Sequence, residues 1–194
     1  MPTEIEVKLR LERPEALRER LTRLGADCLG TVRESNWILD AADGSLRSQG
    51  CALRVRSEHP QAAAGHPRVT LTYKGPRRQD SAARDLKIRE EIETVATDEA
   101  ALLAILSRLG FHPVLSYEKR RETWRLADCL VMLDELPILG WFTEIEGPGP
   151  SAVQEVQARI GLDSAAAETD TYPDLTRRHG QTMPDGTRAL RFPG

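Results

Sequence analysis

Thr3-Glu4-Ile5-Glu6-Val7-Lys8-Leu9-Arg10-Leu11-Glu12 is a stretch of ten residues in which the side chains alternate between two kinds. Apolar residues occupy every second position from Ile5 to Leu11, and acids or bases fill the positions between them from Glu4 to Glu12. This period of two predicts a β-strand, because successive side chains of a strand point to opposite faces. One face is apolar and the other is ionic. A single strand of this kind is typical of a sheet edge whose charges lie in water.

The same ionic alternation recurs in several later segments. It appears in residues 51–58, 68–74, 86–95, 117–125, 130–135 and 142–146. The recurrence favours a closed barrel with its charges inside and its apolar faces outside, covered by helices. A wide, water-filled interior avoids most of the cost of burying ionised groups. An interior of mixed sign suits a polyanion held by bases, together with metal ions held by acids.

The order of the expected elements favours antiparallel pairing. Helical spacing and capping residues predict helices at 14–24, at 98–109, near 151–161 and near 173–179. Strands are expected at 3–12, 28–39, 51–58, 68–74, 86–95, 114–126, 129–135 and 141–146, and residues 40–50 read as a loop. Most strands follow one another as hairpins, so the predicted fold class is α+β: an eight-stranded antiparallel β-barrel with covering helices.

We expect one tunnel domain over residues 1–180. Residues 181–194 contain Pro184, Gly186 and Pro193, and are expected to form a poorly ordered tail.

Composition excludes several classes of function. The 194 residues carry a formal net charge of −3, which argues against general nucleic-acid binding. The chain has no apolar run long enough to span a bilayer and no signal-peptide pattern, so we expect a cytoplasmic protein without membrane contact. The three cysteines lack CxxC spacing, which fits reduced thiols and no zinc site.

Two pairs of glutamates at alternating positions are candidate metal ligands. Glu4 and Glu6 share one face of a strand, about 7 Å apart, and Glu144 and Glu146 repeat the pattern. Facing each other, the pairs would supply oxygen ligands to one or two Mg²⁺ or Mn²⁺ ions, and Asp134 would add another. One such pair is more often a solvated strand face, but two pairs beside alternating bases form a stronger pattern.

Basic residues on the same expected strands are candidates for phosphate contacts, arginine through its planar fork and lysine as a point charge. They are Arg54, Arg56, Lys74, Arg89, Lys119 and Arg121. Each alone would be read as an exposed base. The sequence has no GxxxxGK[ST] loop and no GxGxxG after a strand, so any phosphate site must be built from side chains.

An ordered series of motifs resembles the CYTH superfamily, also called triphosphate tunnel metalloenzymes. The family includes class IV adenylyl cyclases, thiamine triphosphatases and inorganic triphosphatases. The similar segments are Glu4-Ile5-Glu6-Val7-Lys8, Leu53-Arg54-Val55-Arg56, Tyr73-Lys74-Gly75, Arg89-Glu90-Glu91-Ile92-Glu93, Lys119-Arg120-Arg121, Leu139-Gly140-Trp141-Phe142-Thr143-Glu144-Ile145-Glu146 and Thr171-Tyr172-Pro173-Asp174-Leu175. The last segment departs from the family at Thr176, where an aliphatic residue is usual, which leaves the docking of that helix open.

The resemblance implies roles for these residues. Divalent metal, Mg²⁺ or Mn²⁺, would be bound by Glu4, Glu6, Glu144 and Glu146, with Asp134 nearby. The triphosphate would be held by Lys8, Arg54, Arg56, Lys74, Arg89, Lys119 and Arg121. We count Glu4, Glu6, Lys8 and Glu146 as the catalytic group. Glu91 and Glu93 match acidic family positions, and their roles stay open, with pairing to neighbouring bases as the default.

The expected function is metal-dependent hydrolysis of the terminal phosphate of a small-molecule triphosphate, either inorganic triphosphate, a nucleoside triphosphate or thiamine triphosphate. The alternative is a class IV adenylyl cyclase that forms cyclic AMP and pyrophosphate from ATP. A non-catalytic polyphosphate or nucleotide sensor and a purely structural barrel are weaker alternatives. Recognition of the nucleobase or thiazole ring of a substrate is expected at residues 28–39 and 77–85. Trp37 or Trp141 would either stack on that ring or pack in the core. A homodimer is compatible with the sequence.

Overall fold

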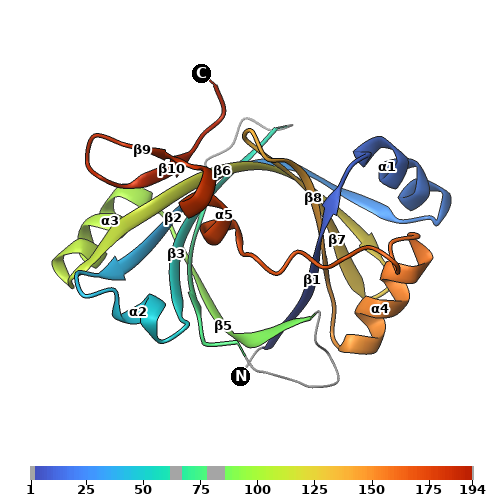
Figure 1. The fold of residues 1–194 in the computed structure, drawn as a ribbon, viewed down its shortest axis with the longest axis horizontal. Coiled ribbons are helices and arrows are strands. Elements are labelled where there is room, and N and C mark those ends of the chain that lie inside the picture. The colour runs from blue at the N-terminus through green and yellow to red at the C-terminus, as the bar shows by residue number, and fades with distance from the viewer. Residues whose placement is uncertain (1–2, 62–66, 78–85, 194) are drawn as a thin grey trace.

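Eight strands close into an antiparallel barrel in the computed structural model, which describes residues 3–61, 67–77 and 86–193 (Figure 1). Around the barrel the strands follow the order β2, β3, β4, β5, β1, β8, β7 and β6, and pairing of β2 with β6 closes the ring. Their bounds are β1 Thr3–Leu11, β2 Asp27–Ala41, β3 Ala52–Pro60, β4 Arg68–Lys74, β5 Lys87–Ala96, β6 Phe111–Leu126, β7 Cys129–Leu136 and β8 Gly140–Glu146. The predicted fold class is confirmed.

Helices lie against the outside of the barrel and across one of its openings (Figure 1). They are α1 Pro14–Arg23, α2 Ser45–Ser48, α3 Glu99–Arg108, α4 Pro150–Arg159 and α5 Tyr172–His179. The short helix α2 falls where the sequence predicted a loop, and backbone amides of Leu46 and Arg47 donate to the Asp40 carboxylate there. In the described residues no helix is both long and apolar enough to cross a membrane.

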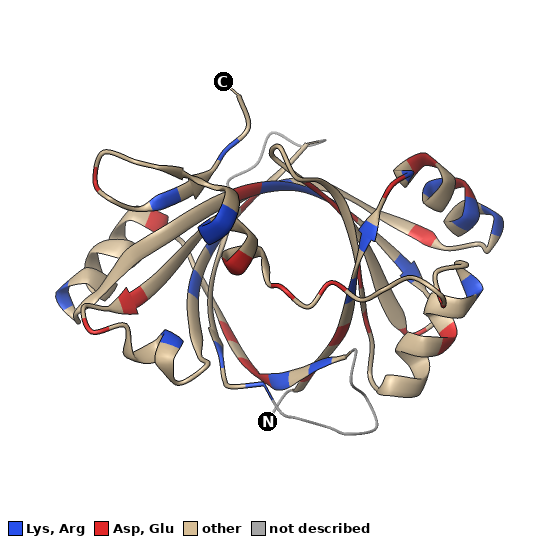
Figure 2. Ribbon diagram, viewed as in Figure 1, with Lys and Arg blue, Asp and Glu red and all other residues tan. Residues whose placement is uncertain are grey.

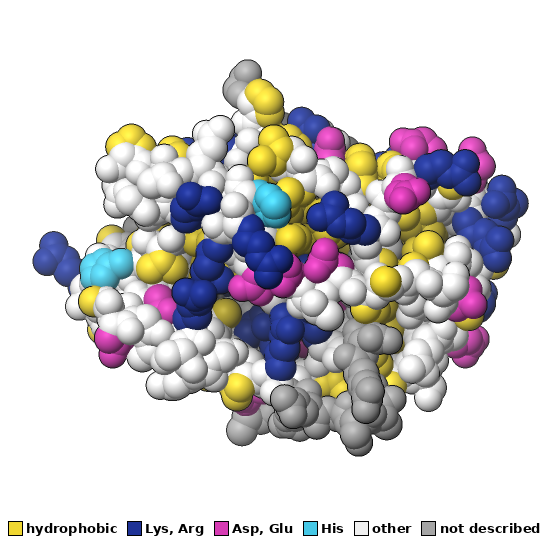
Figure 3. Space-filling model, in the orientation of Figure 1, with side chains coloured by type: hydrophobic (Ala, Val, Ile, Leu, Met, Phe, Trp, Pro, Cys, Tyr) yellow, Lys and Arg dark blue, Asp and Glu magenta, His cyan; other side chains and the backbone are white. Residues whose placement is uncertain are grey.

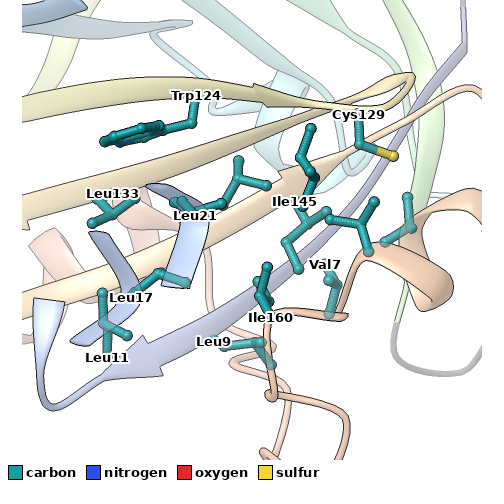
Figure 4. Close-up of a cluster of buried hydrophobic side chains, with 14 residues drawn as sticks. Val7, Leu9, Leu11, Leu17, Leu21, Trp124, Cys129, Leu133, Ile145 and Ile160 are labelled. Carbon is teal, nitrogen blue, oxygen red and sulfur yellow. The ribbon is translucent and has the colours of Figure 1, made fainter. Parts of the chain in front are cut away.

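The apolar faces of the strands point outward, as the alternation predicted. Val7 and Leu9 on β1 pack with Leu17 and Leu21 of α1 and with residues of α4, in a cluster outside the barrel wall (Figure 4). Val7 and Leu9 are at most 1% exposed. Burial of each such side chain contributes about 1.5–3 kcal/mol relative to exposure, which holds these two helices against β1, β7 and β8.

Residues after α5 differ from the expected poorly ordered tail. Strand β9 spans Gln181–Thr182 and strand β10 spans Arg188–Leu190, and β10 pairs in parallel with β6. Leu190 is buried in the cluster that also holds α5. A side chain at Gly180 would overlap the backbone carbonyl oxygens of Thr176 and Ala189, so the glycine lets the tail fold back closely. The prediction of disorder rested on the proline and glycine content, which also suits this turn.

Candidate active site: a charged tunnel

The interior of the barrel is a cavity of about 200 Å³ lined mostly by charged side chains. Acidic and basic positions alternate along the strands that ring the opening (Figure 2). All predicted site residues except Asp134 line this cavity: Glu4, Glu6, Lys8, Arg54, Arg56, Lys74, Arg89, Lys119, Arg121, Glu144 and Glu146. The inward orientation predicted from strand periodicity therefore holds on β1, β3, β4, β5, β6 and β8.

One group of carboxylates lies on β1, β5 and β8. Glu6 is paired in register with Glu146 across the β1–β8 ladder, and Glu4 lies two residues before Glu6. Burial raises the pKa of Glu146 to about 7, and repulsion from Glu4, Glu6 and Glu91 adds to that rise. The raised pKa reflects a concentration of negative charge that a divalent cation would neutralise.

Basic side chains already bind some of these carboxylates. Glu4 accepts hydrogen bonds from Lys74 at 2.5 Å and from Arg89 at 2.9 Å. Burial alone would raise the pKa of Glu4, but Lys74 and Arg89 outweigh it and hold the pKa at about 2. Within the described residues, no three acidic, histidine or cysteine side chains converge as a ready metal site. Lys74 and Arg89 each bind one of the two carboxylate oxygens of Glu4.

A second group of carboxylates is bound more tightly to bases. Asp134 is fully buried and accepts hydrogen bonds from Lys119 at 3.0 Å and from both nitrogens of an Arg121 fork at 2.7 and 2.6 Å. Arg121 also donates to Glu144. Asp134 was predicted as a metal ligand, but it does not line the cavity, and both of its carboxylate oxygens accept hydrogen bonds from Lys119 or Arg121. The geometry favours a role for Asp134 in holding Lys119 and Arg121.

Glu34 on β2 is a further buried carboxylate, and sequence reasoning did not select it. It lies 3.1 Å from Arg56, 3.4 Å from Lys119 and 3.6 Å from Arg121. Burial would raise the pKa of Glu34, but these three bases hold it at about 2. The available signal was the two-residue spacing of Glu34 and Asn36, which places both on one face of β2. Glu34 fixes the positions of three bases that face the cavity.

Lys8 is almost fully buried, with 1% of its surface exposed. Its ammonium donates to the backbone carbonyl of Asp170 and lies 4.3 Å from the ring centroid of Tyr172. Burial lowers the pKa of Lys8 to about 7, and repulsion from Lys87 contributes. Lys87 also lines the cavity, with its Nζ 3.5 Å from a carboxylate oxygen of Glu6. Like Glu34, it was not among the predicted site residues.

Helix α5 closes part of one opening of the tunnel (Figure 1). Thr171 and Asp174 form a capping box that fixes the start of the helix. Tyr172 then packs among Tyr117 and Phe142, and its hydroxyl donates to Asp134 at 2.7 Å. Thr176, the departure from the family pattern, is fully buried and donates to the carbonyl of Tyr172 at 2.8 Å. The threonine is accommodated because its hydroxyl bonds within the helix.

The two candidate stacking residues lie outside the tunnel. Trp37 packs beside the cluster under α3 and donates to Glu99 at 2.6 Å. Trp141 packs against the outer cluster, with the guanidinium of Arg18 5.0 Å from its ring centroid. The alternative of core packing therefore holds for both. The loop 77–85 was also expected to recognise a nucleobase, and its residues 78–85 lie outside the described residues.

Comparison with protein families assigns the chain to a known family. The CYTH domain matches residues 2–172. The chain therefore belongs to the CYTH domain family, the family that its sequence motifs resemble.

Named relatives support the same class. A putative adenylate cyclase of Methanocaldococcus jannaschii is 29% identical over 143 residues, which are 74% of this chain and 75% of that protein. Adenylate cyclase CyaB of Aeromonas hydrophila is 28% identical over 182 residues, 89% of this chain and 87% of that protein.

Solved structures share the fold. The PH1819 protein of Pyrococcus horikoshii OT3 superposes with a TM-score of 0.75 at 26% identity, covering 90% of this chain and 98% of that one. A putative adenylyl cyclase of Hippeastrum, described as having a dominant triphosphatase activity, superposes with a TM-score of 0.66 at 21% identity, covering 93% and 98% of the two chains. The CYTH fold thus hosts proteins named for either activity.

Proposed function

We propose that this CYTH protein is a divalent-metal-dependent enzyme that hydrolyses the terminal phosphate of a triphosphate. The observation that carries the proposal is a tunnel in which bases from five strands and carboxylates from β1 and β8 face the same cavity of about 200 Å³. Membership of a family with relatives named for cyclase and triphosphatase activity supports a triphosphate as the substrate.

Bases around the cavity bind the phosphate oxygens. Arg54 and Arg56 project from β3, Lys119 and Arg121 from β6, and Lys74 from β4. Arginine forks bind phosphate oxygens through two parallel hydrogen bonds, and lysine adds a point charge. Because Asp134 and Glu34 already orient Arg56, Lys119 and Arg121, little side-chain freedom is lost when the substrate binds.

Carboxylates of β1 and β8 fit a hard divalent cation. Glu4, Glu6 and Glu146 offer oxygen ligands, which Mg²⁺ and Mn²⁺ prefer. Burial raises the pKa of Glu146, and repulsion from Glu4 and Glu6 adds to that rise. Glu144 would join them only if Arg121 moves to the phosphate. A bound cation supplies charge neutralisation on the phosphate oxygens and orients the attacking water.

Lys8 is the residue best suited to handle a proton. With a pKa of about 7, its amine is neutral in a large fraction of molecules near neutral pH. Its Nζ is held in place by the carbonyl of Asp170 and the ring of Tyr172. A neutral Nζ accepts a proton from the attacking water as the bond between the terminal phosphorus and its bridging oxygen breaks.

The lining of the cavity favours hydrolysis over cyclisation. Cyclisation needs a nucleoside held in a fixed orientation, and pockets for such ligands are usually lined by apolar or aromatic side chains. The aromatic side chains of the tunnel lining are Tyr117 and Tyr172, and the ring of Tyr172 already faces Lys8. Trp37 and Trp141 lie outside the barrel.

Cyclic AMP formation remains the second candidate function. It is favoured by the cyclase named CyaB, which matches 89% of this chain at 28% identity. In this reaction the 3′-hydroxyl of ATP attacks the α-phosphorus and pyrophosphate leaves. The same bases and cation site would serve both reactions, because both neutralise a triphosphate.

Product analysis distinguishes the candidates. The protein is incubated with tripolyphosphate, ATP or thiamine triphosphate and either Mg²⁺ or Mn²⁺. We expect orthophosphate; cyclic AMP with pyrophosphate would favour the cyclase, and binding without turnover would favour a sensor.

Variants of the tunnel test the assigned roles. Glu4→Gln and Glu146→Gln should each lower metal-dependent turnover by about 100-fold or more, whereas Glu155→Gln on the exposed face of α4 should not. Arg56→Ala should chiefly raise KM, because it removes a phosphate contact. Unchanged turnover in both glutamate variants would remove β1 and β8 from the cation site.

A further inference from the structure

A second cavity, of about 330 Å³, opens at the end of the tunnel beside α5. We call it the vestibule and define it by Arg47, Arg77, Arg177, Asp40 and Asp174. The vestibule and the tunnel share part of their lining, including Arg89, Ala52 and Thr171, so the two cavities are continuous. Lys and Arg side chains gather around this opening, over α2 and α5 (Figure 3).

The two carboxylates of the vestibule accept hydrogen bonds from other groups of the protein. Asp40 accepts hydrogen bonds from the backbone amides of Ala41, Leu46 and Arg47. Asp174 accepts from the amide and hydroxyl of Thr171 through one oxygen and from Arg177 through the other. Both acids therefore hold local structure, and their two negative charges are fewer than the three positive charges of Arg47, Arg77 and Arg177.

The positive charge of the guanidinium groups in the vestibule is only partly balanced by carboxylates. Within the described part of the chain, Arg47 has no carboxylate within ion-pair distance, and Arg77 donates only to the backbone carbonyl of Thr169, at 3.3 Å. Arg177 pairs with Asp174 at 3.1 Å, yet burial lowers the pKa of Arg177 and repulsion from Arg47 contributes. Three arginines that converge on a cavity with two acids leave an excess of positive charge, which attracts an anionic group such as a phosphate.

We propose that the vestibule is a second anion subsite, which binds a phosphate group at the end of the substrate that projects from the tunnel. The inference rests on the proposed function of the tunnel, and it extends the substrate class to molecules with a fourth phosphate in line. The fourth phosphate can belong to an inorganic polyphosphate or to a nucleoside tetraphosphate. Arg47 and Arg177 are the residues that select for it.

Binding measurements without metal test the subsite independently of turnover. Titration calorimetry in EDTA compares tripolyphosphate with tetrapolyphosphate, and ATP with adenosine 5′-tetraphosphate. We expect Arg47→Gln/Arg177→Gln to weaken binding of the four-phosphate ligand about tenfold and that of its three-phosphate partner less than about twofold. An effect on tetrapolyphosphate alone assigns an inorganic substrate, and an effect on the nucleotide alone assigns a nucleoside.

A matched control separates the subsite from a general loss of positive charge. Arg23→Gln/Arg108→Gln removes two charges from α1 and α3 and should leave both affinities unchanged. Equal weakening of three- and four-phosphate ligands by the vestibule variant, or the same effect in the control, would overturn the subsite. If the selective effect is present but no orthophosphate forms with metal, the proposed hydrolysis fails and the subsite stands.

Discussion

Glu146 shows how a single side chain of the tunnel couples function to stability. Its pKa is raised from the usual range to about 7, so the folded protein holds a proton there that the unfolded chain releases near pH 4.5. Between these values the native state binds more protons than the unfolded state, and stability falls as pH rises. Above pH 7 the charged Glu146 destabilises the metal-free protein.

Glu146→Gln should therefore stabilise the metal-free protein at pH 8, by about 1–3 kcal/mol, while it removes a proposed ligand of the cation. Near pH 4.5, where Glu146 is protonated, the same substitution should have little effect. Urea unfolding in EDTA at both pH values measures the difference, with Glu155→Gln as the control. A stability change that is the same at both pH values would contradict the assigned repulsion.

At the scale of one element, α5 contacts the wall of the tunnel and also lies across its opening. Tyr172 contributes two separable interactions: a hydroxyl that donates to buried Asp134 and a ring that faces Lys8 and Lys119. The capping box at Thr171 and Asp174 places this tyrosine in the first turn of the helix. The helix therefore helps to position the bases of the tunnel.

Replacement of Tyr172 separates these interactions. Tyr172→Phe should cost about 1.5–3 kcal/mol of unfolding free energy, because the hydrogen bond that is lost is to a buried carboxylate. Tyr172→Leu should cost about 2–4 kcal/mol and also raise the KM for tripolyphosphate, since the ring that orients Lys8 is absent. Urea unfolding and steady-state kinetics measure both variants. Equal KM values for the two would show that the ring does not position Lys8.

At the scale of the whole molecule, the tunnel gathers cations inside a protein of net charge −3. Burial lowers the pKa of Lys119, and repulsion from Arg121 contributes; Lys8 is affected in the same way by burial and by Lys87. The empty tunnel therefore holds bases that repel one another. A polyanion in the tunnel relieves this repulsion and should stabilise the fold.

Tripolyphosphate without metal should accordingly raise the Tm. At a concentration 100 times its Kd the expected stabilisation is about 2.7 kcal/mol, which corresponds to roughly 5–10 °C for a chain of this size. The shift should shrink as salt screens the interaction. Thermal unfolding with orthophosphate at equal ionic strength is the control. A shift of the same size with orthophosphate would contradict a site built for a triphosphate.

Strand periodicity predicted most of the residues that face the tunnel, although Asp134 does not line it and Lys87 was omitted. In β1, the alternation from Thr3 to Leu11 assigns Glu4, Glu6 and Lys8 to the inside and Val7 and Leu9 to the outside, and the structure agrees. Local signals also located α1, α3, α4 and α5, because caps and apolar spacing act within one turn. The roles of the tunnel residues as ligands and catalysts stay predictions.

The sequence by itself determined the barrel and the inward direction of its charges, because the direction of a side chain in a strand depends only on its position in the alternation. Only the tertiary structure decided which charges meet: Asp134 with Arg121, Glu34 with Arg56, and Lys8 with the carbonyl of Asp170. These pairs join residues of different strands or of a distant segment, so they depend on the register with which β2 closes against β6 and on how α5 enters the opening. Docking of the tail on β6 is likewise a long-range contact, which proline and glycine content alone does not predict.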